Sequence, residues 1–261
     1  MALPKAMLCI LGNQPGVGAP EEVLLRAAGF ATATIRWEEV AAQQRGWMQL
    51  MPILNDASLQ AWVFAGRPAD ITEELLSQVS MLTLGMSRPT PPVTAFVLLG
   101  SGEEPAFPDL LDHVRVFHGN ASFAPRLAAA RLKPMCMLPR PFHIRAHVDP
   151  FIGQWLEIGP LENETWDGFM AGVVDAEVTA FGIGLRGNLP QKSVLHPPQS
   201  GIKGEWGDLR FSACGAKNSI TGDMACYMRV EGCPRIVFIT GYQDENRAHE
   251  MEKGIRHLDL F

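Results

Sequence analysis

Short apolar runs that end in glycine occur four times in the first half of the sequence, and they constrain its fold more than any other feature. The runs cover residues 6–12, 61–66, 94–100 and 114–119, and residues 31–36 form a weaker fifth candidate. Hydrophobicity without alternation is typical of strands in a parallel sheet that helices cover on both faces. A terminal glycine suits the tight turn that leads into the next helix.

Helix signals separate these apolar runs. Pro20, followed by Glu21 and Glu22, is typical of a helix N-terminus. Asp70 and Glu73 have the spacing of a capping box ahead of a second apolar helical segment. This alternation predicts an α/β fold with a doubly wound, mostly parallel sheet of the flavodoxin or Rossmann type.

Prolines at positions 134, 139, 141 and 150 interrupt the alternation and indicate a domain boundary. We therefore expect a doubly wound α/β domain over residues 1–133, a proline-rich linker over 134–150 and a smaller α+β domain over 151–261. With 47% apolar and 19% charged residues, the composition is that of a folded chain.

In the second half, the spacing of large apolar residues predicts a helix over residues 165–178. Residues 235–241 repeat the pattern of a strand ending in glycine, and residues 244–258 have the apolar stripe of a helix. Because this last unit has β-α character, an alternative topology returns it to the first sheet.

The charge and the cysteine content limit which partners and which cellular compartment we expect. The net charge is −6 and no basic run occurs, which argues against nucleic acid as a partner. No apolar stretch approaches the roughly 20 residues that span a bilayer, so we expect no membrane segment. Five cysteines without a C-x-x-C pair favour reduced thiols and a cytoplasmic location. A homo-oligomer is left open, and no cofactor is assigned.

Residues 142–149 contain the set of polar side chains that most suggests a functional site. If this segment is a strand, His143, Arg145, His147 and Asp149 project from one face. His143, His147 and Asp149 are then candidate catalytic residues, and Arg145 is a candidate ligand for an anion. The alternatives are a solvated strand face and a metal site; the fixed charge of Arg145 argues against the metal, and none is assigned.

Three loop residues are further ligand-binding candidates. Asn13, Arg67 and Ser101 follow the first, third and fourth predicted strands. In doubly wound sheets, ligands bind at the carboxyl ends of the strands. The glycine spacing around Asn13 matches neither a dinucleotide fingerprint nor a phosphate-binding P-loop.

These features support three functional hypotheses. The first is a small-molecule or anion-binding protein, whose enzymatic activity the sequence leaves open, with its site in a cleft between the two regions. The second is a non-catalytic interaction or assembly module on an α/β scaffold. The third is a metal-dependent hydrolase that uses His143, His147 and Asp149.

Overall fold

The computed structural model describes residues 3–12, 16–133, 140–190, 199–206, 208–241 and 255–260. By its internal contacts the chain divides into two compact units, and neither is continuous in sequence. The first unit comprises Met1–Leu76, Met86–Phe107 and Leu111–Met137. The second comprises Ser77–Gly85, Pro108–Leu110 and Leu138–Phe261.

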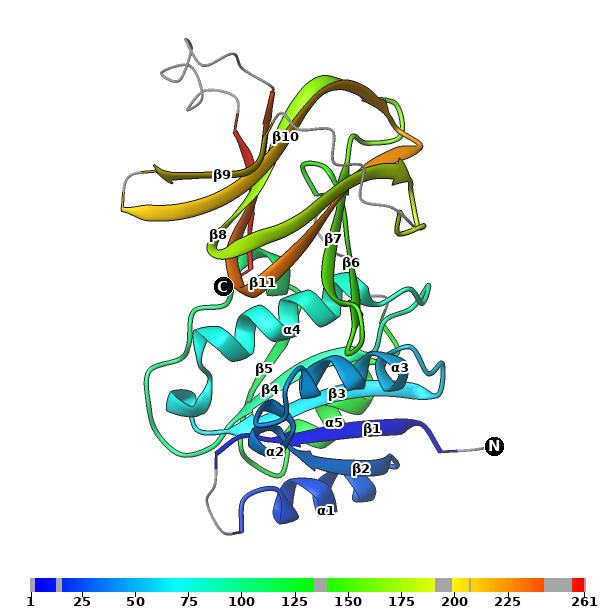
Figure 1. Cartoon of the computed structure of the whole chain (residues 1–261). Coiled ribbons are helices and arrows are strands. Elements are labelled where there is room, and N and C mark those ends of the chain that lie inside the picture. Colours follow the sequence, from blue (N-terminus) through cyan, green and yellow to red (C-terminus); the bar gives the residue numbers. More distant parts are fainter. Residues whose placement is uncertain are drawn as a thin grey trace. The chain divides into compact units, whose positions relative to one another are not determined.

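The first unit contains sheet A, a five-stranded sheet in which every neighbouring pair is parallel (Figure 1). Its spatial order is β2-β1-β3-β4-β5. The strands are β1 (Lys5–Ile10), β2 (Ala31–Arg36), β3 (Leu59–Gly66), β4 (Val93–Leu98) and β5 (Arg115–His118). The prediction of a parallel sheet in the first half is confirmed, and each of the five predicted runs supplies one strand.

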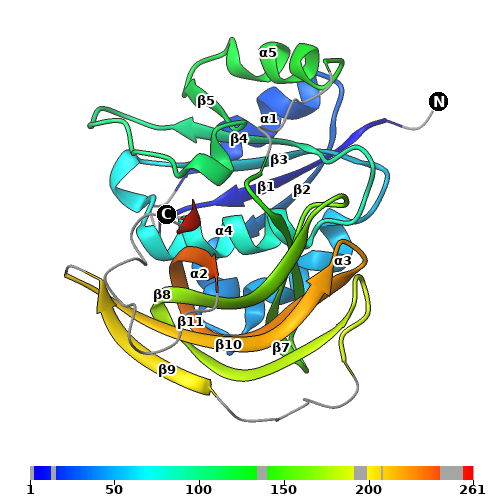
Figure 2. The same cartoon turned by 90° about the horizontal axis from the view of Figure 1, so that it is seen from above.

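Helices α1 (Ala19–Ala27) and α5 (Phe123–Ala130) cover one face of sheet A, where Leu25 and Leu127 pack against the apolar side chains of β1, β3 and β4 (Figure 2). On the other face lie α2 (Trp37–Ala41) and α3 (Met51–Leu54), joined by the 3-10 turn Gly46–Leu50. There Phe64 contacts an aromatic group formed by Trp37, Trp62 and Phe96. Both faces of the sheet are therefore apolar, as the unalternating runs require.

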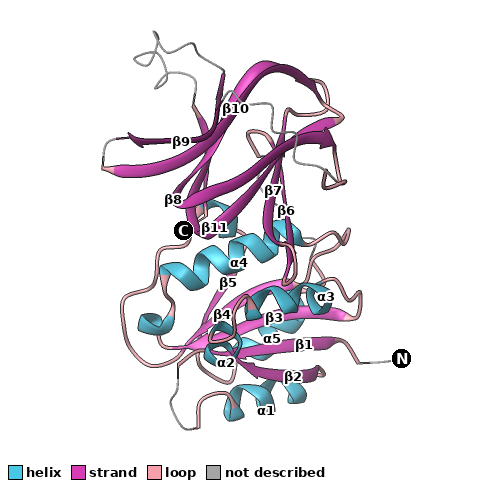
Figure 3. Cartoon of the chain, in the orientation of Figure 1, coloured by secondary structure: helices cyan, strands magenta, loops and turns pink. Residues whose placement is uncertain are grey.

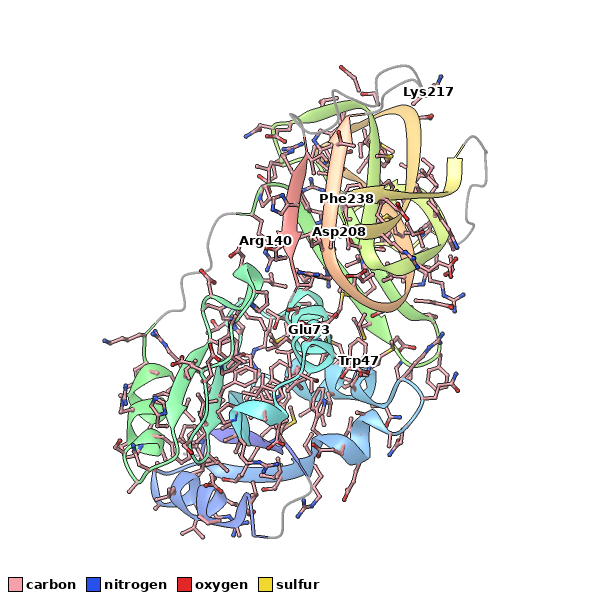
Figure 4. All side chains as sticks on the ribbon, turned by 90° about the vertical axis from the view of Figure 1, so that its left-hand side faces the viewer. Trp47, Glu73, Arg140, Asp208, Lys217 and Phe238 are labelled. Carbon is pink, nitrogen blue, oxygen red and sulfur yellow. The ribbon has the colours of Figure 1, made fainter. Side chains whose placement is uncertain are left out.

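The second unit contains sheet B, which is antiparallel throughout (Figure 3). Its order is β6-β7-β11-β8-β10-β9, and β12 pairs with β11. The strands are β6 (His143–Asp149), β7 (Gly153–Gly159), β8 (Thr165–Leu185), β9 (Gln199–Trp206), β10 (Leu209–Thr221), β11 (Met224–Gly241) and β12 (Arg256–Asp259). Phe238 of β11 is 2% exposed and lies among the side chains of this unit (Figure 4).

The helix predicted over residues 165–178 is wrong, because this segment is the first part of β8. Residues 168–174 are almost all buried, and both faces of the strand carry apolar groups, so the apolar spacing does not distinguish a strand from a helix. Gly168 and Gly172 together with the β-branched Val173 and Val174 favour the strand.

β8 and β11 are long strands, and each bends near its middle. Asp175 of β8 has φ 58°, and Gly232 of β11 has φ 97°. The pairing register of β8 and β11 shifts between Gly232 and Ile236. The bend lets one half of β8 pair with β10 while the other half pairs with β11 alone.

Helix α4 (Glu73–Gly85) contributes to both units, with Ser77–Gly85 in the second. Within the second unit, Ser77 Oγ donates to the carbonyl of Pro234 (3.1 Å) and Ser80 Oγ to that of Leu260 (2.7 Å). The predicted capping role of Asp70 is wrong: Thr72 Oγ1 accepts the N–H of Leu75, while the Asp70 carboxylate binds Arg67.

The C-terminal region differs from its prediction. Residues 235–241 lie in β11 and pair within sheet B, not in sheet A. Of the predicted helix over 244–258, residues 244–254 lie outside the described residues, and Arg256–Asp259 forms strand β12. Within the described part of the chain, we find no helix with the length and apolar character needed to cross a membrane.

Candidate functional site

Strand β6 presents a polar row on one face of sheet B. Its burial alternates strictly: Ile144, Ala146 and Val148 are buried, and the intervening side chains are half-buried. His143, Arg145, His147 and Asp149 therefore share one face, as expected for an extended segment.

One buried carboxylate holds both imidazoles of this row. His143 Nε2 lies 2.7 Å from Glu157 Oε1, and His147 Nε2 lies 2.7 Å from Glu157 Oε2. The Glu157 side chain is 1% exposed, whereas the two imidazoles keep 26% and 15% of their surface. Because an ionised carboxylate only accepts hydrogen bonds, each imidazole carries a proton on Nε2. The imidazoles thus shield the carboxylate and present their other edge outward.

The position of Glu157 follows from strand pairing. β7 runs antiparallel to β6, and Glu157 lies directly opposite Arg145, between the rungs of His143 and His147. On its other side, Glu157 faces Tyr227 of β11. Side chains of paired residues share a face of the sheet, so Glu157 points into the polar row.

The hydrogen bonds determine the ionisation of Glu157. Burial alone would raise its pKa, but the bonds from His143 and His147 and the N–H of Gly187 (3.0 Å) outweigh burial and hold the pKa well below its usual range. Glu157 is therefore ionised at neutral pH, and its charge is fully hydrogen-bonded.

Tyr227 closes one side of this group. Its ring centroid lies 5.9 Å from that of His147, and its hydroxyl donates to the carbonyl of Leu185 and accepts the N–H of Asn188. Burial, together with the nearby charge of Glu157, raises the pKa of Tyr227 to about 12. At neutral pH the phenol is a neutral structural hydrogen-bonding group.

Arg145 stands apart from these bonds. It is half-buried between the two histidines of its strand, and its guanidinium forms no hydrogen bond or ion pair with any described residue. Both oxygens of the Glu157 carboxylate, directly opposite, are taken by the imidazoles. A planar cation with five unused donors is thus held beside two oriented imidazoles.

Asp149 does not bind Glu157 and instead stabilises a turn. Its Oδ1 accepts the N–H groups of Phe151 (2.8 Å) and Ile152 (3.3 Å) and so forms the turn into β7. Among the described residues, no three His, Cys, Asp or Glu side chains are grouped to hold a metal ion. In each imidazole, Nε2 is directed at Glu157.

The loop candidates belong to the first unit. The Arg67 guanidinium pairs with the Asp70 carboxylate, with Nη2 3.2 Å from Oδ1, and this contact lowers the pKa of Asp70. Ser101 is exposed, and Asn13 lies outside the described residues. A Cβ at Gly12 would approach Asp70 to 3.0 Å, and one at Gly102 would approach Pro68 to 3.0 Å, so the loops after β1, β3 and β4 lie close together.

Sequence reasoning missed Glu157. Its signal is a single acidic residue in the apolar run of residues 153–159, between Leu156 and Ile158. Its partners could not be found without the pairing of β6 and β7. Comparison of the chain with protein-family models, curated proteins and solved structures finds no match.

Proposed function

We propose that the second unit binds a small anionic molecule at the face of β6 that carries His143, Arg145 and His147. The observation that carries this proposal is the half-buried Arg145 guanidinium, which forms no hydrogen bond or ion pair with a described residue. Leaving a charged group partly desolvated and unpaired is costly, and a planar guanidinium matches carboxylate or phosphate oxygens bidentately.

The Glu157 carboxylate supports the proposal by orienting the imidazoles. Each ring is fixed through Nε2, and neither Nδ1 atom hydrogen-bonds to a described residue. A ligand that meets fixed side chains loses less conformational entropy on binding. A ring that carries a proton on both nitrogens donates its Nδ1–H to an anion bound at Arg145.

The first unit offers a weaker case for the ligand. Its strand order supports a doubly wound, flavodoxin-like sheet, in which ligands bind at the carboxyl edge of the strands. At that edge, however, the Arg67 guanidinium is already neutralised by Asp70. An incoming anion would compete with this carboxylate, whereas at Arg145 it would find the guanidinium unpaired.

An enzymatic role rests on one specific observation. A histidine oriented by a buried carboxylate is the arrangement of a general base. Within the described residues, no hydroxyl or thiol hydrogen-bonds to either imidazole as a nucleophile would. We therefore propose binding as the primary function. For His143 or His147 to act as a general base, the proton that it removes would have to come from the bound molecule.

The test is a titration of the full-length protein with inorganic phosphate, and then with citrate, followed by NMR of the histidine ring resonances. We expect saturable shifts of the His143 and His147 signals, assigned from His143→Gln and His147→Gln. Arg145→Gln should weaken binding by about tenfold or more, because it removes a charge-assisted hydrogen bond.

The matched control is Arg210→Gln, which removes an exposed arginine from β10 in the same sheet. It should leave the affinity for both anions unchanged. Absence of saturable shifts, or equal affinities for the wild type and Arg145→Gln, would show that this face is a solvated surface.

A further inference from the structure

Strand β2 forms an edge of sheet A. Among the described residues it pairs only with β1, in an uninterrupted register from Ala31 to Arg36. The sequence ATATIR contains no proline and no charge before Arg36, and the ladder has no bulge. Natural edge strands usually carry such features to prevent pairing with another strand. The opposite edge, β5, has only four residues, with Arg115 at its start and His118 at its end.

An exposed apolar residue lies beside this edge on one face of the sheet. Ile53 of α3 is 45% exposed, and Figure 1 shows α1 and α3 on opposite sides of sheet A. Beside Ile53 lies a groove of about 580 Å³, lined by Met7, Ala31 and Ala33 among others. The groove exists because the two alanines are too small to fill the space next to α3.

We propose that two copies of this chain associate through β2, paired antiparallel about a two-fold axis, so that the two five-stranded sheets join edge to edge. Directly opposite residues of an antiparallel pair point to the same face of the sheet. The two-fold axis therefore lies where one residue is opposite its own copy, and not midway between two consecutive residues. Centring it on Ala33 pairs Thr32 with Thr34 of the second copy and Ala31 with Ile35 of the second copy. Threonine pairs across strands are favourable.

The charges on α1 select a second copy as the occupant. Glu22 and Arg26 lie one turn apart and form an ion pair, and Thr34 Oγ1 donates to Glu22 Oε2 (2.9 Å), which places this face of α1 over β2. An antiparallel copy reverses the order of the two charges. Glu22 then faces Arg26 of the second copy, whereas a parallel copy would oppose like charges.

The first experiment is sedimentation velocity of the full chain at concentrations up to about 100 μM, which reveals dimers with micromolar dissociation constants. We expect a reversible dimer. Ala33→Lys places two like charges directly opposite each other at the axis and should weaken the dimer by about tenfold or more. The matched control is Leu132→Lys, which changes a residue that is 76% exposed in the same unit and should leave the dimer unchanged.

The second experiment tests the register. In Ala33→Cys, two cysteines face each other at the axis at a cross-strand Cα distance that a disulfide can bridge. Glutathione disulfide should oxidise the two thiols to an intermolecular disulfide and be reduced to two glutathione molecules. Leu132→Cys and the wild type measure the background from other cysteines.

A chain that stays monomeric at every concentration overturns the proposal, as does a dimer that Ala33→Lys leaves intact. A dimer that Ala33→Lys weakens but that gives no Ala33→Cys disulfide overturns the Ala33-centred pairing. Anion binding at Arg145 is measured separately, so each outcome here is independent of the proposed function.

Discussion

Glu157 shows how one buried charge can organise a polar surface. Its carboxylate accepts hydrogen bonds from two imidazoles and one backbone N–H. Removing one partner from such a group costs more than the bond itself is worth, because a desolvated polar group is left without its hydrogen bond. At the scale of single residues, Glu157 is therefore the position at which stability and the geometry of the proposed site are most closely linked.

We predict that Glu157→Gln lowers the free energy of unfolding by about 2 kcal/mol at neutral pH. Since the folded-state pKa of Glu157 lies below its unfolded value of about 4.3, its stabilisation is fully present above that value and is lost as the pH falls below it. Urea denaturation at a series of pH values should show the difference between the wild type and the variant narrowing with acidification.

Glu162→Gln is the control for this series, because Glu162 is exposed and it should change stability little at any pH. A wild-type-to-Glu157→Gln difference that stays constant from neutral to acidic pH would contradict the assigned ionisation of Glu157.

A second residue-scale prediction concerns Cys9. It is fully buried in β1, and burial raises the pKa of its thiol to about 12, although the hydrogen bond from Trp62 Nε1 (3.3 Å) opposes this shift. At pH 8 the thiolate is almost absent and inaccessible, so a maleimide should modify Cys9 only after unfolding. Mass spectrometry of labelled peptides measures this. Ser101→Cys, at an exposed position, should react rapidly under the same conditions; equal labelling of Cys9 would contradict its burial.

At the scale of elements, the sequence was sufficient to predict a strand or helix wherever its local pattern and its burial in the fold favour the same structure. The apolar runs of sheet A are short and end at glycines, so their type and order could be predicted. In β8 the signals conflict: Trp166, Phe169 and Val173 have helical spacing, yet the segment is a strand buried on both faces. No local pattern shows that this segment will pair with β10 and β11. The orientation of the histidines in β6 was predictable from period two, but Glu157 depends on a pairing partner.

The bend in β11 gives a prediction at this scale. Gly232 has φ 97°, a conformation that residues with a Cβ rarely adopt, and no atom would clash with a Cβ there. Gly232→Ala should therefore cost about 1–2 kcal/mol through backbone conformation alone.

Gly241→Ala is the matched substitution in the same strand, because Gly241 has open space around it and no positive φ. Thermal or urea unfolding should show it to be within about 0.5 kcal/mol of the wild type. Equal effects at the two glycines would contradict the strained bend.

At the scale of the whole molecule, the two units interleave along the sequence. Ser77–Gly85 belongs with sheet B although it precedes that sheet by more than fifty residues. Val79 and Leu82 of this segment are fully buried, and its serines bond to Pro234 and Leu260. The proline-rich stretch that the sequence offers as a linker therefore does not separate two segments that each hold a complete unit.

We predict that a fragment of residues 138–261 does not fold cooperatively, because it lacks Ser77–Gly85. Circular dichroism during urea titration should show a broad transition with a low slope, and a dye for exposed apolar surface should bind. A sharp transition with the slope expected for a domain of this size would show instead that α4 is dispensable for sheet B.

The large sequence separation between Ser80 and its hydrogen-bond acceptor has a consequence for biosynthesis. Its hydrogen-bond acceptor, Leu260, is 180 residues further along the chain. At translation rates of about 5–20 residues per second, the ribosome needs roughly 10–40 s to deliver that partner. Throughout this interval the segment that forms α4 has been synthesised, but the C-terminal strands of sheet B have not. Its apolar side chains lack these partners, which makes this helix a natural target for chaperones.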